Sequence, residues 1–134
     1  MPDDEPARGG DQAVELFMRD EVAMIDSSAS LRDAAERLQA AEVGLLVVGT
    51  VDAVMGVVSE RDIVRCVALD LDLDATSVAT VESEHLKWAT VGTPVDDVAE
   101  EMMENYLRHM LVADDTGMLV GVVSMRDLLT AFLT

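Results

Sequence analysis

One stretch of the chain occurs twice. The sequence GVVSERDIV at residues 56–64 returns as GVVSMRDLL at residues 121–129. Each copy follows two short aliphatic and β-branched runs that are separated by Gly and Asp turn residues, at 43–55 and 108–120. This pattern is typical of a strand, a tight turn and a second strand. A chain of 134 residues that repeats itself in this way is expected to hold two copies of one small unit.

Helical patterns surround each predicted hairpin. Apolar residues recur at helical spacing over 31–41 and 95–103, ahead of the hairpins. Second helices are expected from Glu60 to about Leu69 and from Met125 to about Leu133. Short strands ahead of the first helices (22–25 and 86–91) and short helical lead-ins (14–19 and 78–83) complete the two copies.

Capping signals mark the predicted starts of the first helices. Ser30 with Asp33 begins one helix, and Thr93 with Asp96 begins the other, with Pro94 at its first helical position. The first helices are offset by 64 residues and the repeated stretches by 65. We therefore expect one additional residue between helix and hairpin in the second copy.

The order in each copy is β-α-β-β-α, which predicts an α+β fold with two pseudo-symmetric motifs. A unit of roughly 55 residues buries too little surface to be stable alone, so the two small sheets are expected to pack face to face with the helices outside. The predicted organisation is a disordered acidic tail over 1–12, a first motif over 13–69, a linker over 70–76 and a second motif over 77–134.

Composition excludes several classes of partner. The formal charge is −18 and only four residues are aromatic, so nucleic acids and anionic membrane surfaces are not expected partners. Solubility is a sufficient explanation of the acidity. The single cysteine forms no intrachain disulfide, and neither histidine has metal-ligand or catalytic-triad spacing, so we expect neither a metal site nor an enzyme. A leader sequence and a long apolar run are absent, which favours a cytoplasmic protein.

The Ser-x-Arg-Asp sequence at the start of each second helix has two interpretations. Ser59 with Asp62, and Ser124 with Asp127, are capping pairs that satisfy the first backbone N–H groups of a helix. A cap leaves Arg61 and Arg126 unexplained, because the helix dipole disfavours a positive charge in the first turn. The arginines either form salt bridges with some of the 27 acidic residues or bind an anion. Helix N-termini and guanidinium groups bind phosphate, and a carboxylate suits the two hydroxyls of a ribose, so the second interpretation describes a nucleotide.

The repeat as a whole resembles the cystathionine β-synthase (CBS) domain, and the tandem resembles a CBS-domain pair, or Bateman module. The two GVVS-x-RD stretches in register carry this resemblance, together with SERDIVRCVAL and RHMLVADDTGMLVGVVS, which are similar to small stand-alone proteins of the family. The resemblance covers about residues 14–134. It implies a regulatory module without a required cofactor that binds AMP, ADP, ATP or S-adenosylmethionine in clefts between the two motifs. It also implies a homodimer and a signal that passes to an effector protein.

The resemblance assigns site residues in both copies. It places ribose or phosphate at Ser59 and Asp62 and at Ser124 and Asp127, and basic groups that face a phosphate at Arg108 and His109. Trp88 would stack on adenine, fill the cleft or belong to the core. The residues placed around the base are Met24, Ile25, Leu45, Leu46 and Val47 in one copy and Trp88, Ala89, Thr90, Met110, Leu111 and Val112 in the other.

A second function remains open on the sequence. The helices that follow the repeated stretches carry apolar residues, among them Val64, Val67, Leu129 and Phe132, that either pack in the core or face a partner. The alternative to a nucleotide sensor is therefore a structural dimerisation or protein-interaction module with vestigial nucleotide sites.

Overall fold

The computed structural model of the chain describes residues 9–83 and 86–133. These residues form two compact units, each with one three-stranded sheet. The first unit comprises Glu21–Leu86, and the second joins the residues up to Asp20 to those from Lys87 onward. The predicted α+β class and the predicted order of elements are confirmed in both units.

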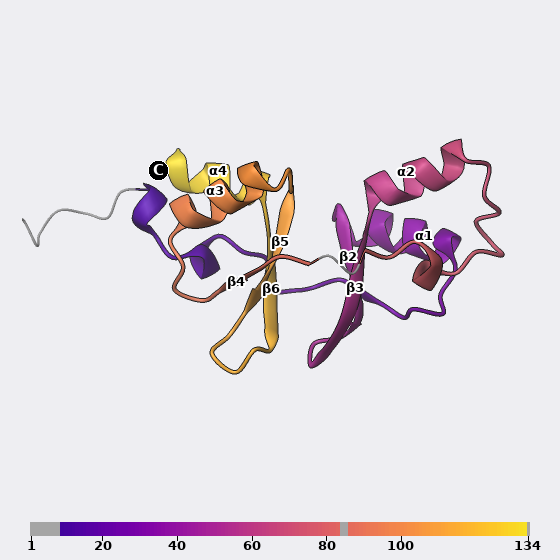
Figure 1. Cartoon of the computed structure of the whole chain (residues 1–134), viewed down its shortest axis with the longest axis horizontal. Helices are drawn as coiled ribbons and strands as arrows, with labels where there is room; N and C mark the ends of the chain where they lie inside the picture. The colour runs from indigo at the N-terminus through magenta and orange to yellow at the C-terminus, as the bar shows by residue number, and fades with distance from the viewer. Residues whose placement is uncertain (1–8, 84–85, 134) are drawn as a thin grey trace, which may run out of the picture. The chain divides into compact units, whose positions relative to one another are not determined.

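In the first unit the sheet has the order β1-β2-β3, with β1 parallel and β3 antiparallel to the central β2. Both helices lie on one face of the sheet (Figure 1). The core between helices and sheet includes Leu31, Leu46 and Val58, all fully buried. The elements are β1 (Met24–Ile25), α1 (Leu31–Ala41), β2 (Leu45–Thr50), β3 (Ala53–Ser59), α2 (Glu60–Ala68) and the 3₁₀ turn η3 (Val78–Thr80).

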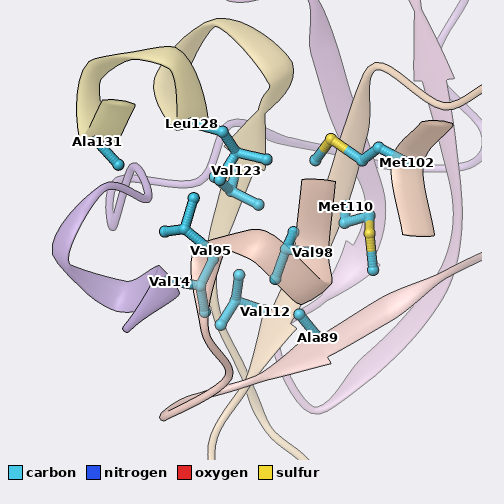
Figure 2. Close-up of a cluster of buried hydrophobic side chains, with 10 residues drawn as sticks. All are labelled: Val14, Ala89, Val95, Val98, Met102, Met110, Val112, Val123, Leu128 and Ala131. Atoms are coloured by element: carbon cyan, nitrogen blue, oxygen red, sulfur yellow. The ribbon is translucent and has the colours of Figure 1, made fainter. Parts of the chain in front are cut away.

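The second unit repeats this arrangement. Its sheet has the order β4-β5-β6, again with one parallel and one antiparallel pair, and its helices lie on one face (Figure 1). The core gathers side chains from both helices and all three strands (Figure 2). The elements are the 3₁₀ turns η1 (Gly9–Asp11) and η2 (Val14–Leu16), β4 (Trp88–Thr90), α3 (Val95–Glu104), β5 (His109–Ala113), β6 (Leu119–Ser124) and α4 (Met125–Phe132).

The lead-in segment of each repeat packs on the body of the other repeat. Residues 12–19 belong to the second unit, where Val14 is fully buried in the core and Arg19 pairs with Val122 of β6. Reciprocally, Val78 is fully buried in the core of the first unit, and Ser83 pairs with Val57 of β3. The two compact units therefore differ from the two sequence repeats.

The glycine of each repeated stretch provides room for the crossing lead-in. A Cβ atom on Gly56 would lie 2.7 Å from the carbonyl oxygen of Ser83, and one on Gly121 would lie 2.9 Å from that of Arg19. Such approaches are closer than protein atoms tolerate, and forcing them costs packing energy. The glycine that precedes Val-Val-Ser in both repeats is thus explained by the crossing of the lead-in.

The additional residue of the second copy lies in the hairpin turn, so the prediction that it lies between helix and hairpin is wrong. Met24 faces Val47 and Trp88 faces Leu111, and both members of the second pair are 64 residues beyond the first. The offset becomes 65 only after the turn between β5 and β6. That turn is held by Asp114, which accepts hydrogen bonds from the hydroxyl of Thr116 and the backbone N–H of Met118, and these bonds lower the pKa of Asp114.

The predicted cap at Thr93 is also wrong. Pro94 occupies the N-cap position, α3 begins at Val95, and no described side chain caps it. The backbone N–H of Val95 instead donates to the carbonyl oxygen of Gln12, at 2.8 Å. The lead-in segment therefore satisfies the helix start that the sequence assigns to a threonine.

Two further expectations differ in extent. The strands expected over 22–25 and 86–91 are shorter, because only Met24–Ile25 and Trp88–Thr90 pair with the hairpins. Within the tail expected over 1–12, Gly9–Asp11 form a 3₁₀ turn with Gly10 buried against α3, and residues 1–8 lie outside the described residues.

Candidate functional site

Both Ser-x-Arg-Asp sequences lie where a strand passes into a helix, and both form complete caps. The backbone N–H of Asp62 donates to Ser59 Oγ at 3.2 Å, and that of Ser59 donates to Asp62 Oδ2 at 2.8 Å. In the second unit the corresponding distances for Ser124 and Asp127 are 3.0 and 2.9 Å. The capping interpretation of the serines and aspartates is confirmed.

A third Ser-x-Arg-Asp sequence begins α1 and shows what the motif does when it is purely structural. Ser30 and Asp33 form the same reciprocal cap. Arg32, between them, forms a hydrogen bond and ion pair with Asp74, which raises the pKa of the guanidinium. This arginine holds the segment that follows α2 against α1.

The arginines of the other two copies differ from Arg32. Arg61 and Arg126 are exposed, and among residues 9–83 and 86–133 neither lies within ion-pair distance of a carboxylate. The described residues therefore do not support the salt-bridge explanation of Arg61 and Arg126, although a salt bridge does explain Arg32. Two guanidinium groups remain available at helix starts, where the helix dipole already favours an anion.

The two aspartates differ in their second carboxylate oxygen. Arg65 Nη1 lies 3.4 Å from Asp62 Oδ1, whereas Oδ2 of Asp62 belongs to the cap. Asp127 Oδ2 belongs to its cap as well, but Oδ1 accepts no hydrogen bond from the described part of the chain. The residue that corresponds to Arg65 in the second unit is Thr130. The carboxylate of Asp127 thus keeps one oxygen for a ligand.

The strands bring the other predicted residues of the second unit next to this cap. His109 pairs with Ser124 across β5 and β6, and Trp88 pairs with Leu111, two residues along β5. Two residues along a strand span about 7 Å. The distance along the sheet from the Ser124–His109 pair to the Trp88–Leu111 pair is thus comparable to the length of a ribose and base. In the first unit Leu45 pairs with Ser59 and Met24 with Val47.

The register also separates side chains that face the core from those on the opposite face. Leu46, Ala89 and Met110 are buried in the helix-facing cores, as Figure 2 shows for the latter two. Only their backbone groups are available to a ligand. Ile25 packs at the edge of the first core and Met24 is half-buried. Trp88 is 38% exposed and lies outside the core cluster, so it is not a core tryptophan.

Arg19 is a neighbour of the candidate site that the sequence does not reveal. It precedes the first repeat along the chain, but its backbone pairs with Val122, two residues before Ser124. Arg108 lies beside Ser124 as well, because its carbonyl oxygen accepts a hydrogen bond from the backbone N–H of Met125 at 2.8 Å. The basic residue at position 19 could be connected with this site only once the crossing of the lead-in was known.

The described residues contain no group of three or more His, Cys, Asp or Glu side chains that could hold a metal ion. Cys66 is buried, and His85 lies outside the described residues. None of the helices described here has the length and apolar character needed to cross a membrane.

The fold and the duplicated strand-to-helix junction define a small tandem α+β module. The protein-family model for the CBS domain matches residues 13–69 and again residues 78–134. This chain therefore belongs to the CBS-domain family and carries two CBS domains in tandem.

Individual relatives agree with this membership. An uncharacterised 17.7 kDa protein of Acidianus ambivalens is 32% identical over 113 residues, which are 84% of this chain and 68% of that protein. An uncharacterised conserved protein of Pyrococcus horikoshii has a crystal structure with a TM-score of 0.83 and 28% identity, covering 91% of this chain and 92% of its own. A CBS-domain protein of Pyrobaculum aerophilum, whose structure is complexed with AMP, has a TM-score of 0.79 and 30% identity over 91% of this chain and 98% of its own.

Proposed function

We propose that this protein is a regulatory module that binds an adenosine-containing ligand, one of AMP, ADP, ATP and S-adenosylmethionine. The observation that carries the proposal is a helix start at which a capping aspartate follows an arginine that forms no ion pair within the described part of the chain, and it is repeated in both units. The N-terminus of a helix and a guanidinium favour phosphate, and a carboxylate oxygen accepts hydrogen bonds from ribose hydroxyls. The relative complexed with AMP supports this assignment.

In this proposal each unit contributes one set of residues. Ser59, Arg61 and Asp62 bind the ribose phosphate end in the first unit, and Ser124, Arg126 and Asp127 do so in the second. The base lies along the strands beside each cap. Its neighbours are Met24, Ile25, Leu45, Leu46 and Val47 in the first unit and Trp88, Ala89, Thr90, Met110 and Leu111 in the second, with Arg108 and His109 toward the phosphate.

The proposal predicts that one adenosine ligand raises the melting temperature. A ligand at 100 times its Kd stabilises a protein by about 2.7 kcal/mol, which corresponds to several degrees for a chain of this size. The measurement is a thermal-shift series with the four ligands, with and without magnesium, and GMP is the control for the base. If none of the four moves the melting temperature, the module does not sense adenosine ligands.

The output of the module is proposed to pass to a partner protein or through homodimerisation. The alternative function is an interaction module whose sites no longer bind nucleotide, and the exposed apolar residues of α2 and α4 favour a protein-binding role. Val64 and Val67 on α2 are 67% and 55% exposed, and Leu129 and Phe132 on α4 are 54% and 47% exposed. Apolar surface of this kind is typical of interfaces.

Dimerisation through these helices predicts twice the monomer mass in sedimentation velocity at micromolar concentration. Val67→Glu and Leu129→Glu should produce monomers, because a carboxylate would be placed in an apolar interface. Asn105→Glu, at an exposed position after α3, is the control and should leave the dimer intact. A wild-type protein that sediments as a monomer at high micromolar concentration would contradict this part of the proposal.

A further inference from the structure

We infer that the chain binds one phosphorylated adenosine, at the second unit, and that the corresponding position of the first unit stays empty. The inference rests on the proposed function and specifies which copy of the site acts and which ligand it takes. It follows from differences between two units that share the same fold and the same cap.

The first difference is the availability of the aspartate. Both oxygens of Asp62 are engaged, one by the cap and the other by Arg65 at 3.4 Å. Asp127 makes the cap with Oδ2 only, and Thr130 stands where Arg65 stands in the first unit. A ribose that binds at Asp62 competes with the guanidinium of Arg65 for Oδ1, whereas one that binds at Asp127 meets no competing donor among the described residues.

The second difference is charge. The cap of the first unit is surrounded by Glu60, Arg61, Asp62 and Arg65, two carboxylates against two guanidinium groups. The second unit has Met125 in the place of Glu60 and Arg108 in the place of Gly44, since the carbonyl oxygens of Arg108 and Gly44 accept the same hydrogen bond from the following helix. Arg126 follows the cap in the helix, and Arg19 pairs through its backbone with Val122. The segments that adjoin the second cap therefore carry three arginines, and the carboxylate of the cap is that of Asp127.

This charge selects the class of ligand. The phosphate of AMP, ADP or ATP is anionic and gains charge-assisted hydrogen bonds from guanidinium groups. S-adenosylmethionine has a sulfonium cation at the corresponding end of its ribose, and its carboxylate lies several bonds farther out, so it gains less from the same groups than a phosphate does. The second unit is therefore suited to an adenosine phosphate.

The test is isothermal titration of the full chain with AMP. One AMP per chain is expected, with a change in the fluorescence of Trp88, the only tryptophan, which pairs with Leu111 in the same sheet. Asp127→Ala should lower the affinity for AMP at least about tenfold, because charged hydrogen bonds are lost. The matched control is Asp33→Ala, which removes an equivalent cap from α1 and should leave AMP affinity within about twofold, even though each variant loses a cap worth about 0.5–2 kcal/mol of stability.

Two further variants test charge and occupancy. Arg108→Gly introduces the residue found at position 44. It should lower the affinity for AMP about tenfold and leave the affinity for adenosine unchanged, because only AMP has a phosphate. The double variant Glu60→Met with Arg65→Thr copies the second unit into the first and should raise the stoichiometry toward two. Both substituted side chains are exposed, so the fold should persist.

The outcomes separate this inference from the proposed function. Two equal AMP sites in the wild-type chain, or AMP binding that survives Asp127→Ala, would overturn the inference and leave a nucleotide-binding module. S-adenosylmethionine that binds as tightly as AMP would overturn the charge argument in the same way. Failure of AMP, ADP, ATP and S-adenosylmethionine to bind at all would reject the proposed function itself.

Discussion

Val14→Asp is expected to lose several kcal/mol of stability, and the loss should appear in the second unit. Val14 is fully buried among Val95, Val98 and Ala131, although it lies in the first sequence repeat. An ionised carboxylate without a partner is costly in such surroundings. Since whole domains are stable by only about 5–15 kcal/mol, this change should remove a large part of the stability of the unit. Urea denaturation followed by Trp88 fluorescence measures the loss.

Val14→Ala gives the same test with a smaller loss of stability, so the protein stays folded. Removing two methyl groups from a full core costs about 2 kcal/mol, from lost burial and the cavity that remains. Hydrogen-exchange mass spectrometry should then show faster exchange in residues 87–133. The matched variant Val78→Ala should accelerate exchange in residues 24–59 instead. Faster exchange of residues 24–59 in Val14→Ala would mean that each lead-in belongs to its own repeat.

The crossing of the lead-ins could not be predicted from the sequence, and the reason is physical. The apolar spacing around Val14 and Val78 shows that each segment has a buried face, but two pseudo-symmetric bodies offer equivalent surfaces for it. The backbone hydrogen bonds that select the partner, such as Val95 N–H to Gln12 and Leu31 N–H to Thr76, are made by groups that every residue carries. The sequence therefore predicts the elements and leaves their pairing open.

The position of the additional residue was predicted wrongly for a related reason, because it depends on the register of the hairpin. Strand β5 is apolar at Met110, Leu111 and Val112 alike, so a shift by one residue leaves the pattern almost unchanged. The faces of the sheet are distinguished only by what packs on them. Strand alternation is a clear signal when one face is polar, and it is weak here.

The caps of α2 and α4 were predictable because their interactions are local. Ser59 and Asp62 are three residues apart, and the geometry of a helix start brings such residues together in any protein. Arg65 follows Asp62 by three residues, a spacing that favours an ion pair on a helix, and Thr130 at the matching position is the signal in the sequence that the two sites differ.

Glu82→Met is expected to stabilise the first unit by about 1–3 kcal/mol, the free energy released when a buried polar group without a partner is removed. Glu82 lies in the lead-in that crosses β3, close to Gly56. Its Oε2 is buried and accepts no hydrogen bond from any described residue. The corresponding residue of the other lead-in is Met18, which packs at the edge of the second core. Chemical denaturation of the purified variant, measured against the wild type, gives the difference in the free energy of unfolding.

The reverse exchange provides the control for this prediction. Met18→Glu should destabilise the second unit by about 1–3 kcal/mol, because it places a carboxylate against Gly121 where a thioether now lies. Glu82→Gln keeps the size of the side chain and a polar end, so its gain should be smaller than that of Glu82→Met. If Glu82→Met instead lowers stability, the buried oxygen has a hydrogen-bond donor in solution, and the lead-in of the first unit is held by that bond as well as by Val78 and the pairing of Ser83 with Val57.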